Sequence, residues 1–173
     1  LLSQGYPEML LAASTVPEDQ LQEIVSRAKA HVESYAGNTV FREWQYWQIV
    51  PAPNGVFRAA DFSPAQEILL GIQVTTPEPR KLIKTVGGLP NPDLQTFLHL
   101  EGNGAVSVWV NGEAWGSCDL SENSVAFIPD IDLEAGKNFI LLNWSVSSSD
   151  DRLAIRFEDK DHHPETSFGF VID

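Results

Sequence analysis

Apolar side chains recur at two different periods along the chain, and the change comes near Asn38. Before it, six apolar residues recur at spacings of three and four, which puts them on one stripe of an amphipathic helix: Leu21, Ile24, Val25, Ala28, Val32 and Tyr35. The run Thr15-Val16-Pro17-Glu18 is typical of a helix start, and Gly37-Asn38 is typical of a helix end. The pattern therefore predicts a helix in this N-terminal part.

Beyond Asn38, short runs rich in β-branched and aromatic residues alternate with turn-forming residues. The clearest is a hairpin, in which Ala105 to Val110 is followed by the turn pair Asn111-Gly112 and by Glu113 to Cys118. About ten strands with no helix between them indicate an antiparallel β-sandwich. The other expected strands are Thr39 to Val50, Val56 to Phe62, Glu67 to Thr75, Arg80 to Val86, Leu94 to Leu100, Val125 to Ile128, Phe139 to Ser145, Leu153 to Glu158 and Phe168 to Ile172.

The change of period divides the chain into a helical lead-in or linker, residues 1–37, and a β-sandwich domain, residues 38–173. A shorter helical turn from Pro7 to Ala13 is expected within the lead-in. A chain of 173 residues buries roughly 70% of its unfolded surface and needs no disulfide to fold. The apolar stripe of the helix needs a partner, and both the sandwich and a neighbouring domain remain open as that partner.

The charge balance excludes some partners. The chain has 24 acidic and 11 basic residues, a net charge of −13, so its surface repels phosphate backbones and nucleic acid is not expected as a partner. No apolar run approaches the roughly 20 residues of a membrane span, so membrane insertion is not expected. Cys118 is the single cysteine, which leaves the redox compartment open. Because the chain opens on Leu1-Leu2, we expect it to be part of a longer protein.

Two motifs resemble the core of the galactose-binding-like jelly rolls, a family that includes sugar-binding modules of bacterial glycoside hydrolases and related surface proteins. The first is the hairpin from Val106 to Gly116, with its Asn-Gly turn. The second runs from Ile128 to Leu142, where Gly136-Lys137-Asn138 precedes a buried strand. The resemblance implies a jelly-roll fold, an accessory role and an extracytoplasmic, bacterial setting. The amphipathic helix is not part of the family pattern.

Aromatic rings are the expected sugar-binding groups, because flat rings stack on the apolar faces of sugars. Trp44 and Tyr46 share one face of an expected strand. Trp109 lies on the opposite face of its strand from three valines, so we expect it on the less buried side. Trp115 follows the hairpin turn and is expected to be the most exposed ring. Trp144 is assigned to the core.

The resemblance also admits a structural calcium ion, and Asp130 and Asp132 are the candidate ligands because they alternate in one loop. The loop lacks the glycine-punctuated spacing of a dedicated calcium site, so solvated charge is the competing interpretation. The adjacent His162-His163 is a weaker candidate for zinc. No other cofactor is expected.

No catalytic motif appears in the sequence, so this chain is not expected to be an enzyme, whereas the larger protein remains open as one. We therefore expect a non-catalytic carbohydrate-binding or accessory module of a larger extracytoplasmic protein, with carbohydrate and the neighbouring domains as partners. The alternative is a structural or protein-interaction domain that orients its neighbours without a small-molecule ligand. An exposed apolar stripe on the helix would favour that alternative, and a stripe packed on the strands would argue against it. A hydrolase or lyase stays a third interpretation, which requires a cleft with a carboxylate pair and a perturbed pKa.

Overall fold

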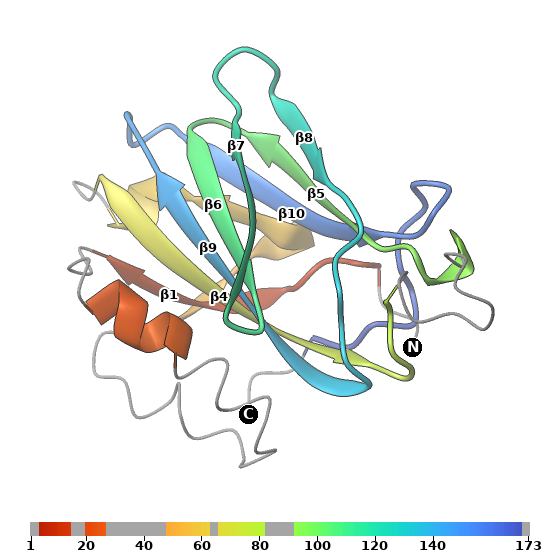
Figure 1. The fold of residues 1–173 in the computed structure, drawn as a ribbon. Helices are drawn as coiled ribbons and strands as arrows, with labels where there is room; N and C mark the ends of the chain where they lie inside the picture. Colours follow the sequence, from red (N-terminus) through yellow and green to blue (C-terminus); the bar gives the residue numbers. More distant parts are fainter. Residues whose placement is uncertain (1–3, 15–19, 27–47, 63–65, 82–91, 171–173) are drawn as a thin grey trace.

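The computed structural model describes residues 4–14, 20–26, 48–62, 66–81 and 92–170. Their strands form two antiparallel sheets that pack face to face (Figure 1). The strands are β1 Met9–Ser14, β2 Gln48–Pro51, β3 Val56–Arg58, β4 Glu67–Thr76, β5 Phe97–Gly102, β6 Ala105–Val110, β7 Glu113–Asp119, β8 Val125–Ile128, β9 Gly136–Ser145 and β10 Arg152–Glu158. One sheet has the order β2-β1-β4-β9-β6-β7, and the other has the order β3-β10-β5-β8. The predicted antiparallel β-sandwich is confirmed.

Alternation along the strands sends one set of apolar side chains into the core between the sheets. In β6, Val106, Val108 and Val110 are buried in this core, while Trp109 faces the other way. Trp144 is fully buried, as expected, and its indole N–H donates to the carbonyl oxygen of Asn103 at 2.8 Å. The indole ring therefore fills the core without leaving its polar atom unsatisfied.

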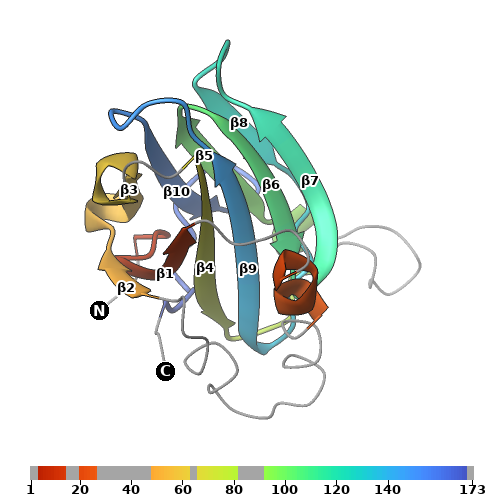
Figure 2. The ribbon, with the colours of Figure 1, turned by 90° about the vertical axis from the view of Figure 1, so that its left-hand side faces the viewer.

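The central strands β4 and β9 are apolar on both faces. They pair over ten residues, from Glu67 opposite Ser145 to Thr76 opposite Gly136. Residues 20–26 form a helix that lies over part of the outer face of the six-stranded sheet (Figure 2). The helix buries Ile24 and Val25 in a second apolar cluster, whose strand residues are Leu11, Leu69, Phe139 and Leu141. The predicted helix is thus confirmed for residues 20–26, and its apolar stripe packs on the strands.

Two turns fix the register of the six-stranded sheet. Asn111 and Gly112 have φ angles of 51° and 85°, the left-handed conformation that an Asn-Gly hairpin turn requires. Asn138 is buried, and its side-chain oxygen accepts hydrogen bonds from the backbone N–H of Glu134 at 2.7 Å and from the side chain of Asn111 at 2.8 Å. Asn138 therefore ties the loop before β9 to the hairpin turn, at the corner that the second sequence motif indicated.

Strand β1 corrects the prediction for the N-terminal segment. Met9–Ser14 pairs with β2 on one side and with β4 on the other, so the predicted helical turn from Pro7 to Ala13 is wrong. A short apolar run fits a buried strand as well as a helix, and periodicity alone does not separate the two. The expectation that residues 1–37 are helical is wrong for this stretch, because the sandwich includes it.

Other boundaries also differ from the sequence pattern. The strand expected from Val56 to Phe62 ends at Arg58 and continues as a short 3-10 helix, Ala59–Phe62. A strand was expected from Phe168 to Ile172, and its described part is residues 168–170. This part forms only an isolated bridge, in which Gly169 pairs with Thr75. The strands expected before residue 48 and over residues 82–86 lie outside the described residues. Within the described ranges, no helix is long and apolar enough to cross a membrane.

Candidate functional site

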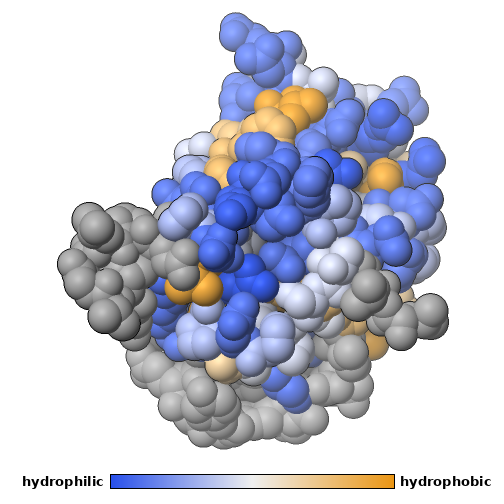
Figure 3. Space-filling view, turned by 90° about the vertical axis from the view of Figure 1, so that its right-hand side faces the viewer, coloured by the Kyte–Doolittle hydropathy of each residue, from blue (hydrophilic) through white to orange (hydrophobic). Residues whose placement is uncertain are grey.

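The outward face of the four-stranded sheet carries charged and aromatic side chains side by side. Alternation buries the leucines of β5 in the core and turns Phe97, His99 and Glu101 outward. In β10 the same alternation turns Arg156 and Glu158 outward, and the register sets Arg156 opposite His99. Figure 3 views the molecule from this side and shows a mostly hydrophilic surface with a hydrophobic strip toward the top.

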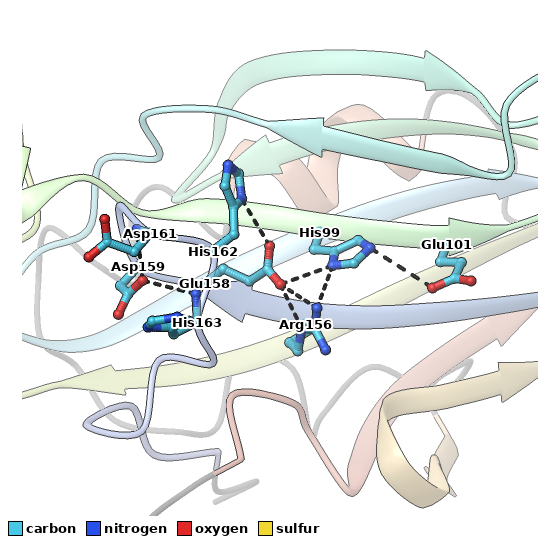
Figure 4. A network of polar contacts seen from close by, with 8 residues as sticks. All are labelled: His99, Glu101, Arg156, Glu158, Asp159, Asp161, His162 and His163. Carbon is cyan, nitrogen blue, oxygen red and sulfur yellow. Dashed lines mark hydrogen bonds and ion pairs between the residues drawn. The ribbon is translucent and has the colours of Figure 1, made fainter.

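Glu158 is the centre of a polar network on this face (Figure 4). Its side chain is only 1% exposed. One carboxylate oxygen accepts two hydrogen bonds from Arg156, that from Nε at 2.9 Å, and lies 3.1 Å from Nδ1 of His99. The other oxygen lies 3.2 Å from Nδ1 of His162. Both oxygens of this buried carboxylate are therefore occupied by basic side chains.

These contacts control the ionisation of Glu158. Burial favours the neutral acid and raises the pKa of Glu158, but the hydrogen bonds from His99, Arg156 and His162 outweigh burial. The net effect lowers the pKa of Glu158 below its ordinary value of 4.5. The carboxylate is therefore ionised at neutral pH, and the network holds one negative charge against the guanidinium.

The Nδ1 atom of His99 has two neighbours that need opposite protonation states. It lies 2.9 Å from a guanidinium nitrogen of Arg156, which only donates, and 3.1 Å from the carboxylate of Glu158, which only accepts. An unprotonated Nδ1 accepts from Arg156, and a protonated Nδ1 donates to Glu158. The Nε2 atom is buried without a hydrogen-bond partner among the described residues and lies 3.9 Å from the carboxylate of Glu101.

A cluster of rings lies against this network. The ring of Phe127, on β8, is 4.7 Å from that of His99 and 4.8 Å from that of His162. The ring of Phe97 is 4.5 Å from that of His162. Phe127 is 46% exposed, so it presents an apolar ring to solvent beside the polar groups.

The loop after β10 places His162 in this cluster. The side chain of Asp159 accepts hydrogen bonds from the backbone N–H groups of Asp161 at 2.9 Å and His163 at 3.0 Å, which closes a tight turn. His162 takes a left-handed conformation in this turn, with a φ of 61°. Its ring consequently lies toward Glu158, in a conformation that residues other than glycine adopt infrequently.

A small pocket opens beside the network, with a cavity volume of about 110 Å³. Ala154 is one of its lining residues and faces outward between Glu101 on β5 and Val56 on β3. Its methyl group leaves a hollow that a longer side chain would fill. The lining residues are Tyr6, Asn54, His99, Glu101, Ala154, Ile155 and Arg156. The hydroxyl of Tyr6 donates to the side-chain oxygen of Asn54 at 3.3 Å, which joins the N-terminal segment to the pocket wall.

Trp109 and Trp115, two of the rings expected to bind ligand, do not line this pocket. Trp109 is half-buried in the cluster beneath the helix, on the outer face of the six-stranded sheet. Trp115 stands where the register of β6 and β7 shifts, between Ala114 and Gly116, and it packs against the core between the sheets. Its indole N–H donates to the carbonyl oxygen of Pro129 at 3.2 Å. The structure does not bring these two rings together.

Trp44 and Tyr46 lie outside the described residues. Asp130 is exposed, has a φ of 55° and accepts a hydrogen bond from the side chain of Gln95 at 2.7 Å. Asp132 is half-buried and has an interaction of its own. Over the described part of the chain, no group of three or more His, Cys, Asp or Glu residues is arranged to hold a metal ion. This structure therefore adds no support to the expected calcium ligands.

Sequence reasoning missed the residues that form the pocket and its network. The sequence does show polar residues at every second position of these two strands. His99 and Glu101 alternate with leucines, and Arg156 and Glu158 alternate with core residues. Ionisable groups of both signs at a period of two mark an outward face. This alternation does not reveal that β5 pairs with β10, because the paired residues are more than 50 positions apart in the sequence.

The fold defines the class as an antiparallel β-sandwich with a helix on one face. No protein-family model and no curated protein sequence matches the chain. Among solved structures, a β-glucosidase from Kluyveromyces marxianus is similar with a TM-score of 0.47 and 10% identity, over 87% of this chain and 16% of that chain.

Two structures of a family two carbohydrate esterase from Clostridium thermocellum, one of them an active site mutant, are similar with a TM-score of 0.34 and 10% identity. The alignment covers 68% of this chain and 33% of the esterase chain. The chain thus spans well under two thirds of each of these proteins. These likenesses are distant.

Proposed function

We propose that this chain is a non-catalytic carbohydrate-binding module, of the galactose-binding-like jelly-roll type, within a larger extracytoplasmic protein. The observation that carries the proposal is the hollow at Ala154, which has donor and acceptor groups on its walls. The exposed ring of Phe127 lies against His99, one of the lining residues. Binding would take place on the outward face of the four-stranded sheet.

The groups around the hollow suit a sugar. Glu101 offers acceptor oxygens, Asn54 offers both a donor and an acceptor, and Arg156 offers donors, so hydroxyl groups find partners of both kinds. The exposed ring of Phe127 offers an apolar surface for the C–H face of a sugar. The pocket is smaller than the roughly 300–1,000 Å³ of a typical ligand site, so it suits one sugar unit of a longer chain.

The state of Glu158 supports binding over catalysis. A general acid for glycoside cleavage needs a raised pKa, and the pKa of Glu158 is lowered. Both of its oxygens contact basic side chains, so neither is presented to a ligand. Cys118 is also a poor nucleophile, because burial raises the pKa of its thiol.

The alternative, a docking domain without a small ligand, depended on an exposed apolar stripe on the helix. Ile24 is 1% exposed and Val25 is 8% exposed, both against the six-stranded sheet. The helix therefore has its partner within the sandwich over residues 20–26. This packing favours the carbohydrate-binding proposal over the docking alternative.

The test is calorimetric titration of the chain with a panel of soluble oligosaccharides, together with affinity electrophoresis in gels that contain polysaccharides. The decisive variant is Ala154→Leu, which fills the hollow without removing a charge or a hydrogen bond. Ala60→Leu is the matched control, because Ala60 is an exposed residue outside the pocket. We expect a glycan that binds the wild type and Ala60→Leu but binds Ala154→Leu at least tenfold more weakly. Equal binding by all three proteins, or no binding across the panel, would count against the proposal.

A further inference from the structure

Two arginines face each other beside the pocket. Arg58 on β3 and Arg152 on β10 are direct partners in the register of the four-stranded sheet. Phe57 and Leu153, their neighbours in the chain, are buried in the core, so alternation turns both arginines to the outward face. Both residues are exposed. The strand pairing therefore holds two positive charges close together on the face that carries the pocket.

This arrangement is unfavourable without a negatively charged partner. Like charges directly opposite each other on neighbouring strands repel and destabilise the pair. The chain has 24 acidic residues and 11 basic ones, so acidic residues that could pair with these arginines are plentiful in the same chain. Yet within the ranges that the structure describes, neither guanidinium forms an ion pair or a hydrogen bond.

The arginine pair lies one step along the sheet from the hollow. Arg152 and Ala154 are two residues apart on the same face of β10, a separation of roughly 7 Å, which is comparable to the length of one sugar unit. Arg156 lies two residues further on, and its Nε and one terminal nitrogen are already engaged by Glu158, which leaves the other terminal nitrogen as a donor. Glu101, opposite Ala154, gives the hollow itself an acidic wall. A ligand with an uncharged ring in the hollow and an acidic group toward Arg152 would match both the acidic wall of the hollow and the positive charge of the arginines.

We propose that Arg58 and Arg152 form a subsite for an acidic group, a carboxylate or a sulfate, carried by the glycan that occupies the Ala154 pocket. This inference rests on the proposed function and names the class of ligand as an acidic oligosaccharide. The guanidinium groups suit such a group because they donate paired hydrogen bonds to planar and tetrahedral oxyanions. The ligand would also remove the repulsion between the two arginines.

The first experiment tests the anion subsite with inorganic sulfate alone. Thermal unfolding is followed in sodium sulfate and in sodium chloride of equal ionic strength. The proteins are the wild type, Arg152→Gln, the double variant Arg58→Gln/Arg152→Gln, and Lys137→Gln, which removes one charge from β9 in the other sheet. We expect sulfate to raise the midpoint of the wild type and Lys137→Gln more than that of both arginine variants. An equal rise in all four proteins would overturn the subsite.

The second experiment separates a glycan from a free anion. Oligosaccharides that carry carboxylates are titrated against the same proteins, together with their methyl esters, in which an added methyl group neutralises each carboxylate. We expect about five- to tenfold tighter binding of the acidic form by the wild type, and equal binding of both forms by the double variant. If neutral sugars bind in the Ala154 pocket without any preference for acid, this inference fails and the proposed function stands. If only sulfate binds and no sugar does, both fail.

The unliganded stability gives an independent readout. Because the two charges repel, Arg152→Gln is expected to be as stable as the wild type or more stable in low salt. A structural role for the arginine pair predicts the opposite, a loss of stability that ligand and salt do not restore. Such a loss would overturn the inference.

Discussion

The buried carboxylate of Glu158 offers the most direct measurement of how the outward face is held together. The change Glu158→Gln keeps the shape of the side chain and removes its charge. A hydrogen bond to a charged group contributes about 1.5–3 kcal/mol, and Glu158 has such contacts with three basic residues. Arg156 and His162 are 39% and 48% exposed, so water replaces part of their interaction with Glu158 when the charge is lost. The total loss of stability is therefore smaller than the sum of three such hydrogen bonds. We expect a loss of about 2–3 kcal/mol in the free energy of unfolding.

The assay is urea unfolding followed by tryptophan fluorescence, to which the buried Trp144 contributes, with the slope m compared between proteins. Glu101→Gln is the matched control, because it removes the same charge from the same face. Its carboxylate is 52% exposed and lies 3.9 Å from its nearest basic atom, so we expect a change below about 0.5 kcal/mol. If Glu158→Gln cost no more than Glu101→Gln, the network around Glu158 would not be stabilising the fold.

The same pair of proteins gives a pH dependence. Since the pKa of Glu158 is lower in the folded protein than its ordinary value of 4.5, the ionised form stabilises the fold. This contribution is complete above that ordinary value and is lost as the pH falls through the lower, folded-state pKa. The difference in unfolding free energy between wild type and Glu158→Gln should therefore shrink below about pH 4.5. A difference that stays constant down to pH 3 would contradict the assigned direction of the shift.

Three further changes test the frame that carries this face. Asn138→Ala removes a buried hub of hydrogen bonds and should cost about 2–4 kcal/mol in urea unfolding, whereas a cost below about 1 kcal/mol would show that the corner does not depend on it. Gly102→Ala places a methyl group 2.0 Å from the carbonyl oxygen of Arg152, at a φ of 149°, and should lower the thermal midpoint by several degrees. Trp109→Ala should cost about 1–3 kcal/mol by opening the contact beneath the helix, with no effect on glycan affinity because it lies on the other sheet. Loss of glycan affinity in that variant would show that the glycan does not bind at the proposed pocket.

The sandwich was predictable because its signals are local. The hairpin around Asn111-Gly112 depends on two residues whose backbone conformation is fixed by their own chemistry, and β6 shows its buried face as alternating valines. The run Met9–Ser14 had no such signal, since five consecutive apolar positions are compatible with both regular structures. Its pairing with β2 and β4 decided between them, and that pairing joins segments far apart in the chain.

The candidate site was not predictable from the sequence for a related reason. Tyr6, Asn54, Glu101 and Ala154 are distributed over the whole chain and meet only in the folded protein. The register of β10 and β5 sets Glu101 opposite Ala154, and a hydrogen bond joins Tyr6 to Asn54. Ala154 in particular is defined by the space above it, and a small residue in a strand leaves no pattern in the sequence. The tryptophans, in contrast, stand out in any sequence, but Trp109 and Trp115 are engaged in packing.

The position of β1 decides where a shortened version of this chain can begin. A fragment that begins at residue 38 would lack the strand between β2 and β4, so β2 would have no neighbour to pair with. The long backbone edge of β4 would then be open to strands of other molecules, which invites aggregation. Such a fragment would also lack Tyr6 and with it one wall of the pocket. A boundary for expression or fusion therefore belongs ahead of residue 4, so that β1 and Tyr6 are both retained.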